Sequence, residues 1–141
     1  MLDIAKLGKF MRVFVAFLVI LISVPAFAGP EGKYTVEGSN PGGGSVYQGT
    51  VAVERNGQTY SVVWDVGGTK YVGTGLGAAN VKGTPTMGPA SEQDNAIAIS
   101  YVSNGTFGLT FYVEQENGQW KGIWTFGGSS QIGTEIWTPA N

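Results

Sequence analysis

The chain has 141 residues, of which 23 are glycine and 12% are aromatic, and its eight basic and ten acidic residues leave a net charge of −2. It contains neither histidine nor cysteine, which excludes Ser-His and Cys-His catalysis, a zinc-thiolate site and stabilisation by disulfides. The basic residues after position 28 are scattered, so they form no stripe that could neutralise nucleic-acid phosphates. We therefore expect no nucleic-acid partner, no metal and no cofactor.

The first 28 residues have the pattern of a secretory signal peptide. A basic stretch ending at Arg12 precedes an apolar run over 13–22, and the small residues of Ala-Phe-Ala at 26–28 suit cleavage. The apolar run is shorter than the about 20 residues of a transmembrane helix, although an uncleaved anchor is the alternative. The sequence therefore predicts a signal peptide over 1–28 and one domain over 29–141. We expect a periplasmic or secreted protein that does not bind a membrane after cleavage.

After residue 28 the sequence predicts β-strands and no helix. Apolar and polar residues alternate with a period of two over 59–66, 106–114 and 119–126, as in half-buried strands. Asn-Gly pairs at 56–57 and 117–118 favour two-residue hairpin turns. In chain order we expect eight strands, at 33–37, 45–55, 59–66, 69–76, 95–101, 106–114, 119–126 and 131–138. Residues 77–94 then form the only long connection.

A repeated local pattern indicates how these strands are arranged. An aromatic residue is followed two positions later by glycine at Tyr47, Tyr71 and Trp120. The two residues share one face of a strand, and the glycine allows a sharp bend that a neighbouring ring can cover. The pattern predicts an all-β fold, an antiparallel up-and-down barrel of about eight strands, with a β-sandwich as the alternative.

The strand periodicity also divides the aromatic side chains between the two faces of the barrel. A filled interior is the favoured interpretation, because rings that alternate with glycine suit a packed barrel. A hollow interior would instead make Tyr47, Trp64, Tyr71 and Trp120 the walls of a ligand pocket. Tyr112 and Trp137 fall on the outward side, where they could anchor a macromolecular partner. The inward set consists of Tyr34, Tyr47, Tyr60, Trp64, Tyr71, Phe107, Phe111, Trp120, Trp124 and Phe126.

The acidic residues offer two weak candidate sites. Glu37 and Glu135 would approach each other if the first and last strands pair, as a carboxylate hydrolase would require, but surface placement is the favoured interpretation. Glu92, Asp94 and Asn95 supply oxygen atoms but lack the spacing of a calcium loop, so a solvated loop is favoured there. We therefore expect no catalytic residues.

Several motifs resemble those of a known family. They are 32–41 (GKYTVEGSNP), 47–51 (YQGTV), 60–64 (YSVVW), 71–75 (YVGTG), 120–124 (WKGIW) and 133–138 (GTEIWT). Together they are similar to small exported proteins that are frequent in rhizobia and related alphaproteobacteria, many of them labelled hypothetical or fibronectin-binding. The resemblance implies an exported β-protein with a fibronectin-like matrix protein as its partner, and it implies no catalytic residue.

Three functions follow as hypotheses. The first is a non-catalytic binding module that contacts an extracellular or periplasmic macromolecule through its outer face or through the loops at 38–45 and 77–94, since loops on a rigid scaffold often carry recognition. The second is a carrier of a small apolar ligand inside the barrel. The third, and the least favoured, is a carboxylate-based hydrolase.

Overall fold

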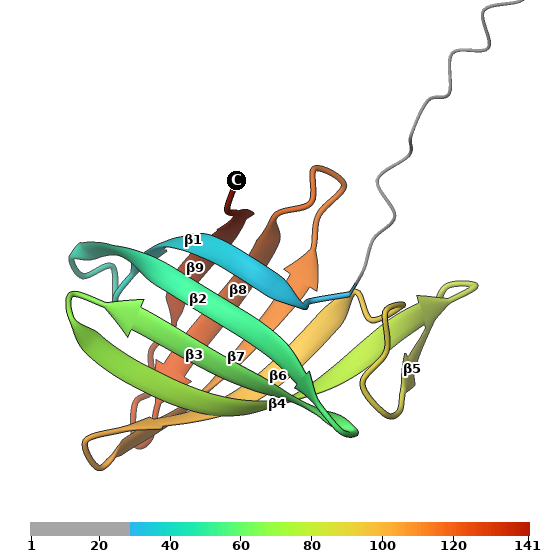
Figure 1. The fold of residues 1–141 in the computed structure, drawn as a ribbon. Helices are drawn as coiled ribbons and strands as arrows, with labels where there is room; N and C mark the ends of the chain where they lie inside the picture. Colours follow the sequence, from blue (N-terminus) through green and yellow to red (C-terminus); the bar gives the residue numbers. More distant parts are fainter. Residues whose placement is uncertain (1–28) are drawn as a thin grey trace, which may run out of the picture.

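The computed structural model describes residues 29–141, so the predicted signal peptide at 1–28 lies outside the described residues. The described chain is all-β and forms one antiparallel sheet, as predicted (Figure 1). Its strands are β1 (Gly32–Ser39), β2 (Val46–Asn56), β3 (Thr59–Val66), β4 (Thr69–Val81), β5 (Thr84–Met87), β6 (Ala96–Ser103), β7 (Thr106–Glu114), β8 (Trp120–Phe126) and β9 (Gly133–Pro139). None of the described residues lies in a helix long and apolar enough to cross a membrane.

Eight of the strands close into the predicted up-and-down barrel. They follow one another in the order β1-β2-β3-β4-β6-β7-β8-β9, and β9 returns to pair with β1, placing Trp137 opposite Val36 (Figure 1). Closure pairs both edges of the eight-stranded barrel, which protects a chain without disulfides from edge-to-edge aggregation at those strands. The β-sandwich alternative is therefore wrong.

The long connection predicted at 77–94 contains a strand that the sequence did not predict. β4 continues to Val81, and β5 pairs back onto it through a turn at Lys82 and Gly83, whose φ angles are 51° and 83°. This hairpin projects beyond the barrel (Figure 1). All four β5 residues are exposed, so they show no apolar alternation. Pro85 lies within β5, where an edge strand tolerates proline.

Cross-strand pairs of glycine and an aromatic residue shape the barrel interior. Each of these rings lies where a Cβ atom on its glycine partner would have to go. Glycine therefore allows the backbone to curve while the ring covers it. Of the three glycines in the predicted pattern, Gly122 is covered in this way by a ring from the neighbouring strand, whereas Gly49 and Gly73 are packed closest to Val66 and Ile99 and their neighbouring backbone. The pairs are Tyr47 with Gly38, Tyr101 with Gly108, Tyr112 with Gly122, and Trp124 with Gly133.

The predicted inward face of β7 is wrong. Phe107 and Phe111 lie on the outer surface with 64% and 46% of their area exposed, whereas Tyr112 is 1% exposed inside the barrel. The β6–β7 hairpin explains this, because it pairs Tyr101 with Gly108 and directly paired residues share a face. Tyr101 points inward, and so β7 turns Gly108 and Tyr112 inward as well.

The predicted outward position of Trp137 is wrong for the same kind of reason. β8 and β9 pair Trp120 with Trp137, so both indoles share the interior, where they are 1% and 0% exposed. Trp137 packs on the Tyr112 ring with a centroid separation of 3.9 Å. Neither Tyr112 nor Trp137 can therefore contact a macromolecular partner in the folded barrel.

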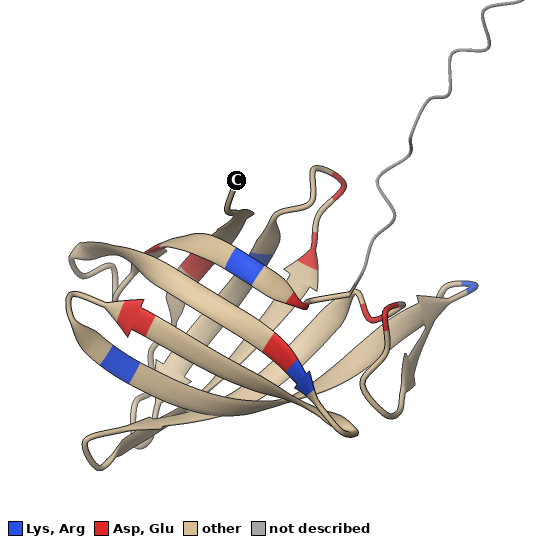
Figure 2. Ribbon diagram, in the orientation of Figure 1, with Lys and Arg blue, Asp and Glu red and all other residues tan. Residues whose placement is uncertain are grey.

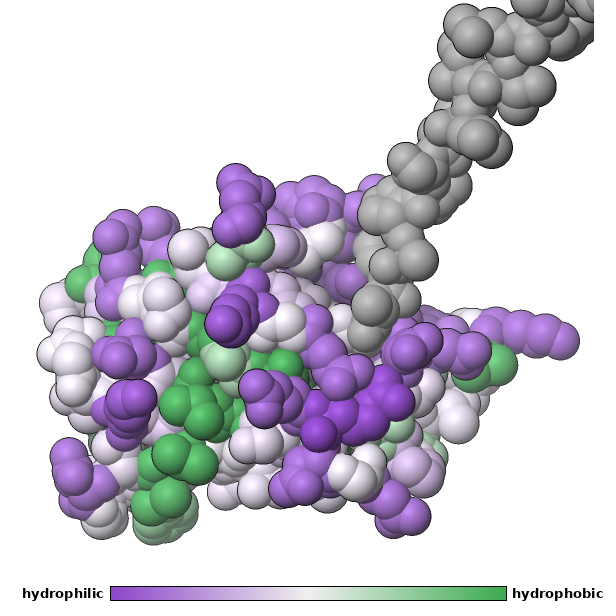
Figure 3. All heavy atoms as spheres, viewed as in Figure 1, coloured by the Kyte–Doolittle hydropathy of each residue, from purple (hydrophilic) through white to green (hydrophobic). Residues whose placement is uncertain are grey.

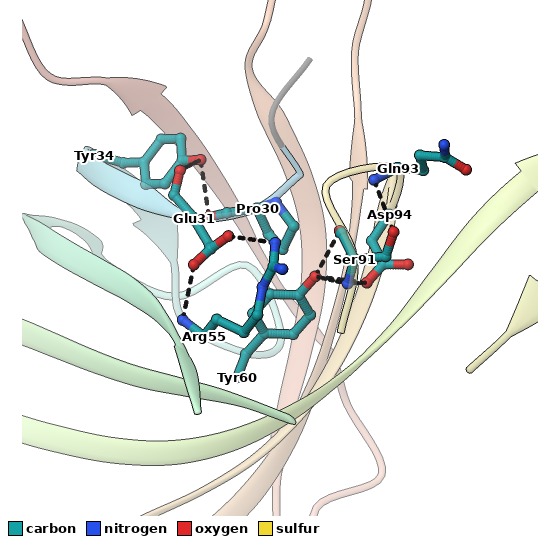
Figure 4. Close-up of polar contacts among 8 residues, drawn as sticks. All are labelled: Pro30, Glu31, Tyr34, Arg55, Tyr60, Ser91, Gln93 and Asp94. Carbon is teal, nitrogen blue, oxygen red and sulfur yellow. Dashed lines mark hydrogen bonds and ion pairs between the residues drawn. The ribbon is translucent and has the colours of Figure 1, made fainter. Parts of the chain in front are cut away.

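One end of the barrel is closed by the segment that follows β5. Asp94 is 4% exposed and accepts hydrogen bonds from the Tyr60 hydroxyl group at 2.5 Å and from the Ser91 backbone N–H at 2.9 Å (Figure 4). The Tyr34 hydroxyl group donates to the Pro30 carbonyl oxygen at 3.0 Å. These contacts fix both the N-terminal segment and residues 88–95 across the barrel end.

The solvated loop favoured for Glu92, Asp94 and Asn95 is confirmed for Glu92 but wrong for Asp94. Asp94 is turned inward to Tyr60, whereas Glu92 is exposed. In the part of the chain that the structure describes, no three acidic side chains gather where they could hold a metal ion.

Charged residues are unevenly distributed over the outside of the barrel. Lysine, arginine and acidic residues mark β1 to β4, whereas β6 carries none (Figure 2). Figure 3 views the molecule from the side of β1 to β4 and shows many hydrophilic residues there, with a hydrophobic strip among them. The outward side chains of β4, β6, β7 and β8 are mostly apolar, and we name this set the apolar face. It consists of Val72, Leu76, Val102, Phe107, Leu109, Phe111, Val113 and Ile123, each 41–64% exposed.

Candidate functional site

The end of the barrel opposite the closed end contains a cavity of about 400 Å³. It lies where β3 ends and where β4 and β7 begin, and Asn40 of the 40–45 loop contributes to its rim. The barrel is thus filled at one end and hollow at the other, so neither predicted interior describes it alone. The lining consists of Asn40, Tyr47, Trp64, Val66, Tyr71, Tyr101, Thr106, Thr110, Tyr112, Trp124, Phe126 and Glu135.

Three of the four predicted wall residues line this cavity. Tyr47, Trp64 and Tyr71 do so, whereas Trp120 does not, because it lies opposite Trp137 in the filled part of the barrel. Among the aromatic residues predicted to face inward, Trp124 and Phe126 also line the cavity. Sequence analysis missed the roles of Tyr101, Thr110 and Glu135.

A buried carboxylate group forms part of the cavity lining. Glu135 on β9 is 6% exposed. Its Oε1 atom accepts hydrogen bonds from Trp64 Nε1 at 3.0 Å, the Tyr112 hydroxyl group at 2.7 Å and Trp137 Nε1 at 2.6 Å. Its Oε2 atom accepts one from the Tyr47 hydroxyl group at 2.5 Å. The carboxylate therefore joins four strands, β2, β3, β7 and β9, across the interior.

Every partner of this carboxylate is electrically neutral. Indole N–H and phenol O–H groups supply all four hydrogen bonds, and no lysine or arginine lines the cavity. Within residues 29–141, the one ion pair joins Glu31 and Arg55 at 2.7 Å on the surface at the closed end (Figure 4). Glu135 thus has hydrogen-bond donors but no positive counter-charge.

The tyrosines around Glu135 remain protonated well beyond neutral pH. Burial, followed by the negative charge of Glu135, raises the pKa of Tyr47 and of Tyr112 far above the ordinary value of 10.0. Burial also raises the pKa of Tyr101 to about 12, with smaller contributions from Tyr71 and Glu135. Since these hydroxyl groups keep their protons, Tyr47 and Tyr112 serve as hydrogen-bond donors to Glu135 at all physiological pH values.

The remaining wall consists of aromatic rings packed edge to face. Tyr47 and Trp124 lie 6.1 Å apart with an interplanar angle of 74°, and Tyr71 and Tyr101 lie 6.1 Å apart at 77°. Trp64 packs against Tyr101 at 6.1 Å in the same manner. Such packing is the preferred geometry of aromatic pairs. The cavity is therefore an aromatic chamber that contains one buried negative charge.

The carboxylate pair that a hydrolase would require does not form, and surface placement, the favoured interpretation, is confirmed for Glu37 but wrong for Glu135. β1 and β9 do pair, but Glu135 lies opposite Gly38, and Glu37 lies opposite Ile136. Adjacent positions of a strand point to opposite faces, so Glu37 is exposed outside while Glu135 is buried inside. Glu37 and Glu135 therefore do not form the two-carboxylate arrangement of a glycoside hydrolase.

No protein-family model matches the chain, and neither the curated proteins nor the solved structures provide a match. The resemblance to small exported alphaproteobacterial proteins stays a prediction. Inferences about function therefore rest on the geometry of the barrel and its cavity.

Proposed function

We propose that this protein is a non-catalytic binding protein that holds a small organic molecule inside the barrel. The observation that carries the proposal is the cavity of about 400 Å³ with Glu135 buried in its lining. Ligand pockets of proteins typically have volumes of about 300–1,000 Å³, largely apolar walls and a few well-placed polar groups. The volume of this cavity lies near the lower end of that range, which suits a small ligand.

The lining favours binding over catalysis. Among its residues, Glu135 is the only acidic one, and no histidine, lysine or serine accompanies it. The tyrosine hydroxyl groups that contact Glu135 have pKa values raised far above neutrality, so they are poorly suited to accept or release protons in a reaction. The arrangement instead resembles a rigid receptor whose polar groups orient a ligand.

The proposal is tested by the mass of the protein under native and denaturing conditions. The chain is expressed with residues 1–28 and the exported form is purified. We expect a small adduct that appears natively and disappears on denaturation. Thr106→Trp, which fills the cavity rim, should abolish the adduct, whereas Thr74→Trp on the outer surface of β4 should retain it. An adduct that survives in Thr106→Trp would contradict the proposed site.

A second candidate function, recognition of a macromolecule, is favoured by the apolar face. The register places Val72, Val102 and Phe107 side by side on successive strands, and Leu76, Phe111 and Ile123 in a parallel row. Exposed apolar patches above a few hundred Å² are rare on monomers and mark interaction sites. The predicted macromolecular partner would therefore contact this face, and Tyr112 and Trp137 would take no part.

The partner we propose for the apolar face is a second copy of this chain. Its eight side chains are each 41–64% exposed on four neighbouring strands, so a second copy could remove one continuous apolar surface from water. The outward side chains of β6 and β7 are uncharged, and the exposed Lys70 and Lys121 belong to the flanking strands β4 and β8. The centres of two such faces can therefore meet without burying unpaired charges, while the two lysines stay at the margin.

The oligomeric state tests this second candidate. Sedimentation equilibrium should show a dimer that Leu109→Lys converts to a monomer. Thr50→Lys adds the same charge to the exposed side of β2 and should leave the dimer intact. A wild-type protein that remains monomeric at high concentration would overturn the dimer.

A further inference from the structure

The charge of the cavity indicates which class of ligand fits it. We propose that the barrel binds a small organic ammonium ion whose positive charge pairs with Glu135. This inference rests on the proposed function and extends it from a small molecule to a cation. Three features carry it: the missing counter-charge, the remaining hydrogen-bonding capacity of Oε2 and the aromatic wall.

The first feature is the missing counter-charge. A buried carboxylate is costly unless it is both hydrogen-bonded and paired with an opposite charge. Glu135 has the hydrogen bonds, but the five basic residues between positions 29 and 141 are all absent from the cavity lining. A cationic ligand would supply the missing charge in a region of low dielectric constant, whereas an anionic ligand would be repelled. The site therefore selects a positive charge.

The second feature is the difference between the two carboxylate oxygen atoms. Oε1 already accepts three hydrogen bonds, whereas Oε2 accepts only the one from Tyr47. Each carboxylate oxygen has two lone pairs, so the three donors on Oε1 already share its two, whereas Tyr47 uses one of the two on Oε2. Oε2 therefore keeps capacity for one more donor, and an ammonium N–H group supplies that donor. Glu135 and Tyr47 both line the cavity, so a ligand there can approach the carboxylate.

The third feature is the aromatic wall. Tyr47, Tyr71, Tyr101, Trp64 and Trp124 all line the same chamber as Glu135. Aromatic ring faces attract cations, most strongly where water is excluded, and cages of such rings recognise substituted ammonium groups. A cation with organic substituents gains both from the rings and from the carboxylate. An inorganic cation has no organic substituents to pack on the rings, and it would exchange its hydration shell for one carboxylate and neutral hydroxyl groups.

Three probes of similar size separate the charge from the shape of the ligand: benzylamine, which is protonated at neutral pH, benzyl alcohol and benzoate. Binding is followed by the NMR signals of the indole N–H groups of Trp64 and Trp137, which donate to Glu135. We expect benzylamine to shift these signals and to bind at least about tenfold more tightly than benzyl alcohol, a difference of about 1.4 kcal/mol. Benzoate should not bind.

Glu135→Gln should remove the tenfold preference for the amine while benzyl alcohol still binds. Glu37→Gln is the matched control, because it removes the same charge from the exposed side of the neighbouring strand, and it should keep the preference. If Glu135→Gln fails to fold, the ranking of the three probes on the wild-type protein still decides the inference.

Two results would overturn the inference. Equal or tighter binding of benzyl alcohol or benzoate, or no binding of benzylamine, would contradict a cation site. A co-purified molecule that is neutral or acidic would leave the proposed binding function intact and overturn only the ammonium ligand.

Discussion

Tyr112 on β7 donates a 2.7 Å hydrogen bond to Glu135 on β9 across the strand that separates them. Gly122 of β8 lies between the two residues and is paired in register with both. A Cβ atom at position 122 would collide with the Tyr112 ring and approach the Phe111 carbonyl oxygen to 2.6 Å. The missing side chain at Gly122 is therefore what allows a β7 residue to reach a β9 carboxylate.

Gly122→Ala should consequently destabilise the barrel. The new methyl group displaces Tyr112 from Glu135, and overpacking of this kind typically costs about 1–3 kcal/mol. Chemical denaturation measures the free energy of unfolding. Gly88→Ala is the control, because a Cβ atom there meets no atom within 4 Å, and it should change the free energy of unfolding by less than about 0.5 kcal/mol. Equal stabilities of the two variants would contradict this role of Gly122.

Removal of the carboxylate should be more damaging than removal of one donor. Glu135→Leu leaves two indole N–H groups and two tyrosine hydroxyl groups inside the barrel without an acceptor. Each unsatisfied buried group costs about 1–3 kcal/mol, so a loss of at least about 3 kcal/mol is expected. Tyr47→Phe removes a single donor and should cost about 1 kcal/mol. Denaturant titrations of both variants check the order of the two effects, and a Glu135→Leu protein as stable as Tyr47→Phe would contradict it.

The closed end depends on Asp94. Asp94→Ala leaves the Tyr60 hydroxyl group and the Ser91 N–H without this acceptor, and should cost about 1–3 kcal/mol. Hydrogen exchange should also accelerate over residues 88–95. Glu92→Ala, which alters an exposed neighbour, should change neither quantity. Unchanged exchange in Asp94→Ala would show that other contacts hold the segment.

Stability should fall steeply in alkali because of the buried tyrosines. Burial is the largest cause that raises the pKa of Tyr34 and of Tyr101 from 10.0 to about 12. Below pH 10 these tyrosines are protonated in both states, and the free energy of unfolding has its full value. Between pH 10 and about 12 the unfolded chain releases protons that the native barrel retains, so each residue lowers the free energy of unfolding by up to about 3 kcal/mol.

Two measurements check the alkaline behaviour. The ultraviolet absorbance of tyrosinate should show little ionisation near pH 10 in the native protein and ordinary ionisation in denaturant. The midpoint of denaturant unfolding should fall over the same pH range in which the two titrations differ. A native titration that is complete near pH 10 would contradict the burial of these side chains.

Alternating residues and glycine-containing turns were sufficient to predict the barrel, because period-two patterns and hairpin turns are local signals. These signals were not sufficient to predict which face of β7 points inward, because both faces carry large apolar side chains. Phe107 and Leu109 lie on one face and Tyr112 lies on the other. Turn geometry resolves such cases. With Tyr101 assigned inward, the two-residue turn at 104–105 requires Gly108 and Tyr112 to face inward too.

The cavity was harder to predict, because an acidic residue on a strand usually lies on the surface. Glu135 shares its face of β9 with Gly133 and Trp137, and the pairing of Trp120 with Trp137 turns that face inward. Its burial depends on four donors from four strands, which only the closed barrel brings together. The sequence does not predict the β5 hairpin, because its residues do not alternate between apolar and polar and none of them is buried in a core.

The central claim is that an organic cation occupies the barrel next to Glu135. A crystal structure of the protein soaked with para-bromobenzylamine tests it directly, because the anomalous signal of bromine locates the ligand independently of the protein. We predict one bromine peak within the cavity near Trp124, with the amine nitrogen within hydrogen-bonding distance of Glu135 Oε2. Bromine peaks confined to the outer surface, at a ligand concentration that saturates the crystal, would contradict the account.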